Sequence, residues 1–244
     1  MKIIGVIPAR YRSSRFEGKP LALICGKPMI IHVAEQVQKA VGKESTYVAT
    51  DDHRIIQLVE SHGYKCVMTS ESCLTGTDRL WEVAQKVQAD IYVNIQGDEP
   101  MISPLDIERI INEKKRNMES VVNGMLPLSG DEDPGDINIP KVLVNKDDRL
   151  IYMSRLPIPG LKDDKKRIDR SSFLKQVCIY GFSYCQLKAF GTNGGKADYE
   201  DYEDIEILRF MDLSVPIKMV MMAKSTIAVD RPEDVVKVEK ALQG

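Results

Sequence analysis

The fold is indicated first by residues 3–50, IIGVIPARYRSSRFEGKPLALICGKPMIIHVAEQVQKAVGKESTYVAT. Ile3–Pro8 is a short apolar run that is rich in β-branched residues and ends at a proline, which predicts a buried parallel strand. Pro28–Val41 places apolar residues at helical spacing and ends before a glycine, and Ser45–Thr50 is again typical of a strand. These residues therefore predict a strand–helix–strand unit that begins a parallel sheet.

The same alternation continues through the first half of the chain. Asp51 or Asp52 is placed to cap a helix that runs to Gly63, and Ser103 is placed to cap a later one. Further strands and helices are expected at Lys65–Met68, Thr77–Gln88, Asp90–Ile95 and from Pro104 to about Arg116. This order predicts a mostly parallel sheet with helices on both faces. Ligands bind at the carboxyl ends of the strands of such sheets, so three polar segments should converge on one rim: Ala9–Lys19, Thr50–Asp52 and Gln96–Glu99.

The second half is less regular and predicts a mixed subdomain inserted into the sheet. Its strands are expected at Ser120–Pro127, Lys141–Asn145, Arg149–Met153, Leu174–Phe182 and Ile217–Ala223. Its helices are expected at Ser183–Phe190, about Tyr202–Leu213, and Pro232–Leu242. The almost wholly charged stretch Leu161–Arg170 predicts an exposed, mobile loop. No linker divides the chain, so residues 1–244 are expected to form a single domain.

Composition excludes several classes of partner. The 244 residues carry 36 acidic and 34 basic side chains, which argues against nucleic-acid coating and against polybasic membrane binding. No apolar stretch approaches the roughly 20 residues of a membrane span, and the N-terminal apolar run is too short and early for a secretory signal. An odd number of cysteines without zinc-site spacing fits a reducing compartment: Cys25, Cys66, Cys73, Cys178 and Cys185. We therefore expect a soluble, cytoplasmic protein without a membrane or nucleic-acid partner.

Positive charge is nevertheless concentrated after the first strand, in PARYRSSRFEGKP (residues 8–20). Backbone N–H groups and cationic side chains of such a loop can share the charge of a polyphosphate. The sequence is neither a Walker A loop nor a dinucleotide-binding glycine motif. A solvated basic loop is the alternative, and the position at a strand end favours phosphate binding. The basic residues in residues 1–20 are Lys2, Arg10, Arg12, Arg15 and Lys19, against the single acid Glu17.

Two carboxylates are candidates for a metal site beside that loop. Gly97 permits a tight turn after a buried strand, so Asp98 and Glu99 should stand at the rim and face the basic loop. A carboxylate beside a triphosphate most naturally holds Mg²⁺. Asp230 ends an apolar run in a distant part of the chain and would supply a second carboxylate. The alternative is that these acids only form a turn or cap a helix.

Two further segments could contact a substrate. In Thr75–Arg79 (TGTDR) a glycine between hydroxyl residues at a helix start can approach a base or ribose, although Thr77 could simply cap the helix. Ala197–Glu206 (ADYEDYEDIE) holds six acids and no base. Such a run is usually a solvated helix start, and one or two of its acids could instead bind sugar hydroxyls.

Together these segments resemble the CMP-KDO synthetase family, the 3-deoxy-manno-octulosonate cytidylyltransferases. The motifs IPARYRSSR…GKPL, GKPMIIHV, VATDD, GTDRL, NIQGDEPMI, IYGF and VDRPEDV occur in the family's order over nearly the whole chain. The resemblance implies an α/β nucleotide-diphospho-sugar transferase fold, a Rossmann-like three-layer sheet with an inserted α+β subdomain, and a homodimer. The nucleotide part would be mainly 1–120 and 217–244, and the sugar-binding and dimer part about 121–216.

The implied reaction joins CTP to a 2-keto-3-deoxy sugar acid, most simply KDO, and releases pyrophosphate by Mg²⁺-assisted in-line attack on the α-phosphate. The catalytic set would be Arg10, Lys19, Asp98 and Asp230, with Asp98 and Asp230 as the metal ligands. The nucleotide would contact Pro8, Ala9, Arg10, Ser14, Arg15, Lys19, Thr75, Gly76, Thr77, Arg79, Gln96 and Gly97. The sugar would contact Gln96, Arg155, Gln176, Tyr180, Glu203 and Glu206.

The chain departs from the family pattern at three places. Glu17 stands where the family usually has proline, which puts an acid inside the phosphate loop. Gln176 replaces a histidine that meets the sugar, and YEDIEILRFMDL replaces a helix similar to LExxExLEQLR. The acceptor is therefore left open between KDO and a modified relative such as 8-amino-KDO or a nonulosonate-type acid. A non-catalytic nucleotide-binding module is the alternative outside this class, and the product could serve lipopolysaccharide or capsule biosynthesis.

Overall fold

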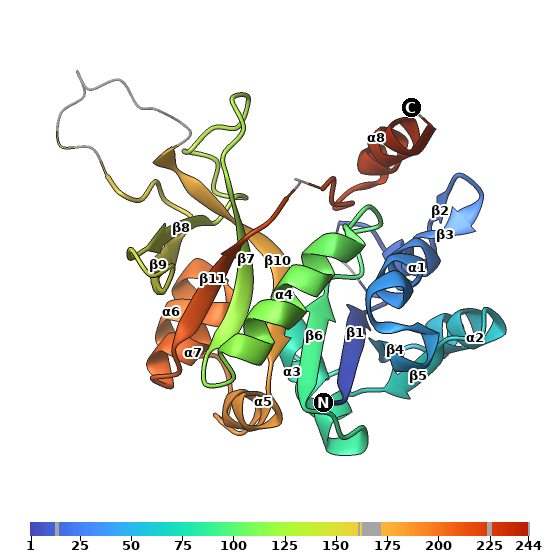
Figure 1. The fold of residues 1–244 in the computed structure, drawn as a ribbon. Coiled ribbons are helices and arrows are strands. Elements are labelled where there is room, and N and C mark those ends of the chain that lie inside the picture. The colour runs from blue at the N-terminus through green and yellow to red at the C-terminus, as the bar shows by residue number, and fades with distance from the viewer. Residues whose placement is uncertain (13–14, 161, 163–171, 224–225, 244) are drawn as a thin grey trace.

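One mixed sheet forms the centre of the molecule. The computed structural model describes residues 1–12, 15–160, 162, 172–223 and 226–243. Within these residues the strand order is β11-β7-β10-β6-β1-β4-β5, and β8 and β9 extend the sheet beside β10 (Figure 1). The strands of the first half are β1 (Ile3–Ala9), β4 (Thr46–Thr50), β5 (Lys65–Met68) and β6 (Ile91–Ile95). Those of the second half are β7 (Val121–Pro127), β8 (Lys141–Val144), β9 (Leu150–Ser154), β10 (Leu174–Phe182) and β11 (Ile217–Met221).

The first half forms the predicted parallel unit. β1 pairs in parallel with β4 and β6, and β4 pairs in parallel with β5. Its helices are α1 (Met29–Val41), α2 (His53–Ser61), α3 (Gly76–Lys86) and α4 (Pro104–Arg116). Asp52 caps α2 by accepting a hydrogen bond from the Arg54 backbone N–H, whereas Ser103 precedes α4 without a capping side-chain bond.

Helices cover both faces of the sheet, as the sequence predicted. One core packs α1, α2 and α4 against residues such as Ile7 and Val93, and the other packs α3 and α5 (Tyr184–Gly191) against Val6 and Tyr92. Side chains alternate between the two faces along a strand, so neighbouring residues of β1 and β6 enter different cores. The three-layer α/β architecture is confirmed.

The second half is mixed, also as predicted. β10 runs antiparallel between β6 and β7, β11 runs parallel to β7, and β8 and β9 form a hairpin (Figure 1). The predicted helix Tyr202–Leu213 is wrong. α6 (Asp198–Glu203) ends at Asp204, whose φ of 49° is left-handed, and a 3₁₀ turn (Glu206–Leu208) leads into the short α7 (Arg209–Asp212). Of the predicted loop 161–170 only Lys162 lies among the described residues, and it is exposed.

The C-terminal helix α8 (Pro232–Gln243) returns to the N-terminal part of the chain. It packs on the hairpin of β2 (Leu23–Ile24) and β3 (Lys27–Pro28) through a small separate core. The Cys25 backbone N–H donates to Glu239 Oε1 at 2.7 Å. This packing holds the start of α8 close to the carboxyl end of β1.

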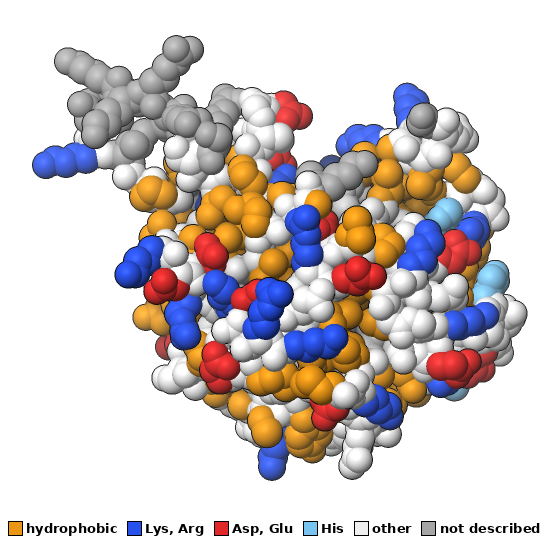
Figure 2. All heavy atoms as spheres, in the orientation of Figure 1, with side chains coloured by type: hydrophobic (Ala, Val, Ile, Leu, Met, Phe, Trp, Pro, Cys, Tyr) orange, Lys and Arg blue, Asp and Glu red, His pale blue; other side chains and the backbone are white. Residues whose placement is uncertain are grey.

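The surface charge and the helix lengths agree with the expectations drawn from the composition. Acidic and basic side chains intermingle over the face seen in Figure 2, without a field of one sign. Across the described ranges, each helix is too short or too polar to cross a membrane.

Candidate functional site

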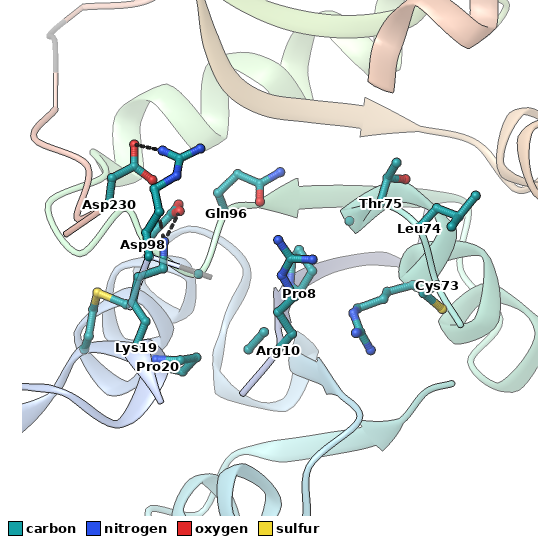
Figure 3. A pocket seen from close by; sticks show the side chains of 16 residues that line it. Pro8, Arg10, Lys19, Pro20, Cys73, Leu74, Thr75, Gln96, Asp98 and Asp230 are labelled. Atoms are coloured by element: carbon teal, nitrogen blue, oxygen red, sulfur yellow. Dashed lines mark hydrogen bonds and ion pairs between the residues drawn. The ribbon is translucent and has the colours of Figure 1, made fainter. Parts of the chain in front are cut away.

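A cavity of about 270 Å³ opens at the carboxyl ends of β1 and β6 (Figure 3). Figure 3 shows Arg10 between two groups of side chains, with Lys19, Asp98 and Asp230 on one side and Cys73–Thr75 on the other. The structure brings together most of the predicted nucleotide and metal residues here: Pro8, Ala9, Arg10, Arg15, Lys19, Thr75, Gly76, Arg79, Gln96, Gly97, Asp98 and Asp230. Ser14 lies outside the described residues.

Lys19 is the centre of the charged end of this cavity. Its Nζ donates to Asp98 Oδ2 at 2.7 Å and lies 3.9 Å from Asp230 Oδ1. Arg15 Nη1 lies 3.8 Å from Asp230 Oδ2 on the solvent side. The Lys19 side chain is 15% exposed and that of Asp230 is 60% exposed, so the group is open to a ligand from one side.

Backbone turns set this arrangement. Gly18 adopts a φ of 68°, which favours glycine, and its N–H donates to Tyr11 O at 2.9 Å, so the basic loop folds back on itself before Lys19. A Cβ at Gly97 would lie 2.7 Å from Pro8 O, so only glycine lets the turn before Asp98 approach β1 this closely. The Val229 N–H donates to Asp98 O at 2.9 Å, which fixes the chain next to Asp230.

The two carboxylates fit a hard divalent cation such as Mg²⁺. Asp98 and Asp230 already converge on one cationic group, the Lys19 ammonium, and both offer oxygen ligands. Among the described residues no cluster of three or more His, Cys, Asp or Glu side chains could enclose a metal by itself. A metal held here would take its other ligands from phosphate oxygens and water, which is how proteins commonly bind Mg²⁺.

The start of α3 forms the opposite wall. Thr75, not Thr77, caps the helix: the Asp78 N–H donates to Thr75 Oγ1 at 3.2 Å and the Thr75 N–H donates to Asp78 Oδ2 at 2.9 Å. Thr77 is buried and lines neither cavity described here. Arg79 donates to Asp51 Oδ2 at 2.5 Å and to Thr69 Oγ1 at 2.7 Å. These bonds hold α3 to the segments that follow β4 and β5.

A second cavity of about 320 Å³ adjoins the first and shares Thr75, Gly76 and Gln96 with it. Five of the six predicted sugar residues line it: Gln96, Arg155, Gln176, Tyr180 and Glu206. Glu206 lines this second cavity, and its carboxylate accepts from the Thr77 N–H at 3.0 Å, which ties the cavity wall to the start of α3. Burial raises the pKa of Glu206 above its usual value, and its Oε1 has no hydrogen-bond partner among the described residues.

Arg155 lines the second cavity as predicted, whereas Glu203 does not. Glu203 lies outside the lining of the second cavity, and its Oε2 accepts from the Arg155 N–H at 2.8 Å. The Arg155 guanidinium donates to three backbone carbonyls, those of Glu203, Ile137 and Asp204. These neutral partners hold the guanidinium in place, and its Nη2 also forms a long ion pair of 4.0 Å with Asp204 Oδ2.

Several acids do not lie where the sequence placed them. The Glu99 carboxylate turns away from the basic loop and accepts from Thr226 Oγ1, and burial raises its pKa to about 7. Glu17 is exposed and outside the cavity lining, so it does not enter the phosphate loop's interior. Asp51 and Asp52 follow β4 where it ends beside β1, but they pair with Arg79 and Arg54 and line neither cavity.

The acidic run 197–206 is not simply a solvated helix start. Glu200 is buried and bonds both its oxygens to Arg209, at 2.6 and 2.7 Å. Sequence reasoning also missed several residues that line the cavities. These residues belong to no recognisable motif, because only the fold brings them to the cavities. They are Met29, Cys73 and Leu74 in the first cavity, and Asn138, Pro140, Cys178 and Ile205 in the second.

Comparison with known proteins gives consistent results over the full length. The family described as "Cytidylyltransferase" matches residues 4–215. The chain is 38% identical over 237 residues to the 3-deoxy-manno-octulosonate cytidylyltransferase of Escherichia coli, covering 97% of this chain and 94% of the relative. It is 39% identical over 250 residues to the protein of the same name from Parabacteroides distasonis, covering 99% and 97%.

Solved structures agree. A CMP:2-keto-3-deoxy-manno-octonic acid synthetase complexed with CTP superposes with a TM-score of 0.90 at 38% identity, covering 100% of this chain and 99% of that one. The inositol-1-phosphate CTP transferase of T. maritima shares the fold with a TM-score of 0.71 at 13% identity. The chain therefore belongs to the cytidylyltransferase family, among relatives that are 3-deoxy-manno-octulosonate cytidylyltransferases.

Proposed function

We propose that this protein transfers the CMP group of CTP to KDO and releases pyrophosphate. One observation carries the proposal: the cavity around Lys19, Asp98 and Asp230 shares a wall with a second cavity that contains Arg155. Two substrates bound in adjoining cavities would meet at Gln96 and Gly76, which belong to both. Holding two reactants in contact supplies much of the catalysis in a displacement of this kind.

The basic loop binds the triphosphate in this proposal. Arg10, Arg15 and Lys19 reach the first cavity from one loop, and each can donate to phosphate oxygens. The nucleoside would lie at the start of α3, where Thr75 lines the side of the cavity opposite Asp98 (Figure 3) and Gly76 also belongs to the lining. As the pyrophosphate leaves, the same cationic side chains stabilise the charge that develops on it.

Asp98 and Asp230 would hold Mg²⁺ against the phosphates. When bound, the ion would neutralise phosphate charge and polarise the α-phosphate. Lys19, which contacts both carboxylates in the free protein, would then be released to donate to the triphosphate.

The second cavity binds the sugar acid. The Arg155 guanidinium keeps N–H groups beyond those bonded to carbonyls, and these can donate to the acceptor's carboxylate. Gln176, Tyr180 and Glu206 offer polar groups for hydroxyls. The anomeric hydroxyl oxygen forms the new bond to the α-phosphorus, the bond to pyrophosphate breaks, and the hydroxyl proton passes to water.

A modified octulosonate such as 8-amino-KDO, or a nonulosonate-type acid, is the alternative acceptor. The acids Asp204 and Glu206 line the second cavity, and such groups can accept from an ammonium as well as from a hydroxyl.

We also propose that the protein is a cytoplasmic homodimer that acts in lipopolysaccharide biosynthesis. Five free cysteines support the compartment, and the exposed Ile137, Ile151 and Leu156 support a dimer, which sedimentation equilibrium would test by a mass twice the monomer's.

A substrate panel tests the proposal. Pyrophosphate release is measured with CTP, UTP, GTP or ATP, each combined with KDO, 8-amino-KDO or a nonulosonate, at saturating Mg²⁺. We expect CTP with KDO to give the highest kcat/KM and omission of Mg²⁺ to abolish turnover. Preference for another acceptor would replace KDO, and CTP binding without pyrophosphate release under any condition would indicate a non-catalytic binding module.

A further inference from the structure

The strand β10 lines the second cavity, the proposed acceptor cavity, and its pairing is irregular at that point. On β7 the pairing with β10 advances by one residue, from Gly124 to Asn123, while on β10 it advances from Val177 to Tyr180. The extra residues form a bulge in β10. This strand lies between β7 and β6 (Figure 1). Bulges next to active sites change the direction of side chains.

Asn123 fills this bulge. Its side chain is fully buried and its Nδ2 donates to Val177 O at 2.9 Å and to Ile179 O at 2.8 Å. The amide therefore supplies a hydrogen-bond donor to two backbone carbonyls of the irregular stretch of β10. Because both N–H groups of Asn123 are used, its Oδ1 is left to accept a hydrogen bond.

The acceptor at Asn123 Oδ1 in turn orients Gln176. Gln176 Nε2 donates to Asn123 Oδ1 at 3.1 Å and to the Tyr180 hydroxyl at 3.1 Å. Both N–H groups of Gln176 are thereby used inside the protein. Its Oε1 accepts no hydrogen bond from the described residues, and Gln176 lines the acceptor cavity. The cavity thus presents a carbonyl oxygen at this position.

We propose that Asn123 is a positioning residue that fixes the Gln176 amide with its oxygen towards the acceptor, so that this cavity recognises a hydroxyl or ammonium donor. Asn123 lines neither cavity and acts through Gln176. The inference rests on the proposed function for the identity of the acceptor. A site built to bond a substrate's donor group discriminates strongly against analogues that lack it.

Steady-state kinetics on Asn123→Leu, Gln176→Leu and the double variant test the proposal. We expect each single variant to raise the KM for KDO about tenfold and to leave the KM for CTP within about twofold. The double variant should be no worse than Gln176→Leu, because both changes remove one and the same interaction. The control is Val122→Ala, a fully buried apolar residue next to Asn123, which should leave the KM for KDO unchanged.

Monodeoxy analogues of KDO supply a readout that a merely structural role would not move. One analogue should lose about tenfold in kcat/KM with the wild-type protein and little with Gln176→Leu. An equal rise of both KM values in Asn123→Leu, additive effects in the double variant, or an effect of Val122→Ala of the same size would overturn the proposal. If Asn123→Leu does not fold, an unchanged KM for KDO in Gln176→Leu would also overturn it.

Urea unfolding of the free protein separates this inference from the proposed function. A double-mutant cycle of Asn123→Ser and Gln176→Leu should show a coupling of roughly fivefold in the unfolding equilibrium constant. Additive effects on unfolding would remove the premise, whatever the substrate. If the wild-type protein released no pyrophosphate with KDO, the proposed function would fail, and the unfolding cycle would still decide the inference.

Discussion

The contacts of Lys19 with Asp98 and Asp230 define the geometry of the charged end of the site. Its ammonium bonds Asp98 at 2.7 Å and lies 3.9 Å from Asp230, so a cation already occupies the space between two acids from distant parts of the chain. Each contact is modest in a partly exposed group. Their importance lies in geometry, because the same two carboxylates face the cavity that the basic loop lines.

Replacing one of these carboxylates should affect chemistry more than folding. Asp98→Asn keeps the size of the side chain and removes its charge, so we expect turnover to fall about 100-fold or more while the CTP Kd changes little. The matched control is Glu35→Gln, which breaks another lysine–carboxylate pair of 2.7 Å, with Lys27. Pyrophosphate release at saturating Mg²⁺ measures both variants. Near-wild-type turnover of Asp98→Asn would remove Asp98 from the catalytic set.

Lys114 joins three elements of the fold, and its hydrogen-bond partners among the described residues are neutral oxygens. Its fully buried ammonium donates to Met118 O, Ser120 O and Gln186 Oε1, which connects α4 with the start of β7 and with α5. Burial lowers the pKa of Lys114 from 10.5 to about 8. At this junction a charged lysine is therefore less favourable in the native state than in the unfolded chain.

This shift predicts a pH-dependent stability. Between pH 8 and 10 the unfolded chain keeps a proton at Lys114 that the native state has lost, so the stability of the folded state rises with pH. We expect wild-type protein to gain about 2 kcal/mol relative to Lys114→Met over this range, by urea unfolding. Lys115→Met, which removes an exposed lysine of the same helix, should run parallel to wild type. Parallel curves for Lys114→Met and wild type would contradict a lowered Lys114 pKa.

Elements with a regular apolar pattern were predictable from the sequence. Lys65–Met68, Leu174–Phe182 and Pro104–Arg116 form the elements that periodicity and flanking prolines indicate. Between Glu200 and Arg209 the pattern predicts one helix, but the left-handed Asp204 ends α6, and Glu200 and Arg209 form a buried ion pair. Such a contact links residues through tertiary structure, and an acidic run in the sequence gives no sign of its partner.

Some residues of the site were likewise predictable from the sequence, and others were not. Lys19, Asp98 and Asp230 lie at strand ends or helix starts, where the alternation of strands and helices predicts a ligand, and the structure brings them together. Glu99 and Glu17 turned elsewhere, since neighbouring positions of a turn point in different directions. Asn123 could not be found from sequence, because it acts on an irregularity in strand pairing that no pattern records.

At the scale of the whole molecule, the sheet places two cavities side by side. Strands β1 and β6 end at the charged cavity, and the antiparallel β10 beside β6 lines the second one. α8 brings Asp230 back to β1 by packing on the β2–β3 hairpin. The parallel half, the mixed insertion and the C-terminal helix therefore each contribute to one continuous site.

In the proposed reaction, the two adjoining cavities join the α-phosphate of CTP to KDO. The most direct measurement is ³¹P NMR of a completed reaction of the wild-type protein with CTP, KDO and Mg²⁺. We expect equal amounts of pyrophosphate and a CMP–sugar phosphodiester, with no CDP. Formation of CDP and inorganic phosphate, or unchanged CTP, would rule out this transfer of CMP to KDO.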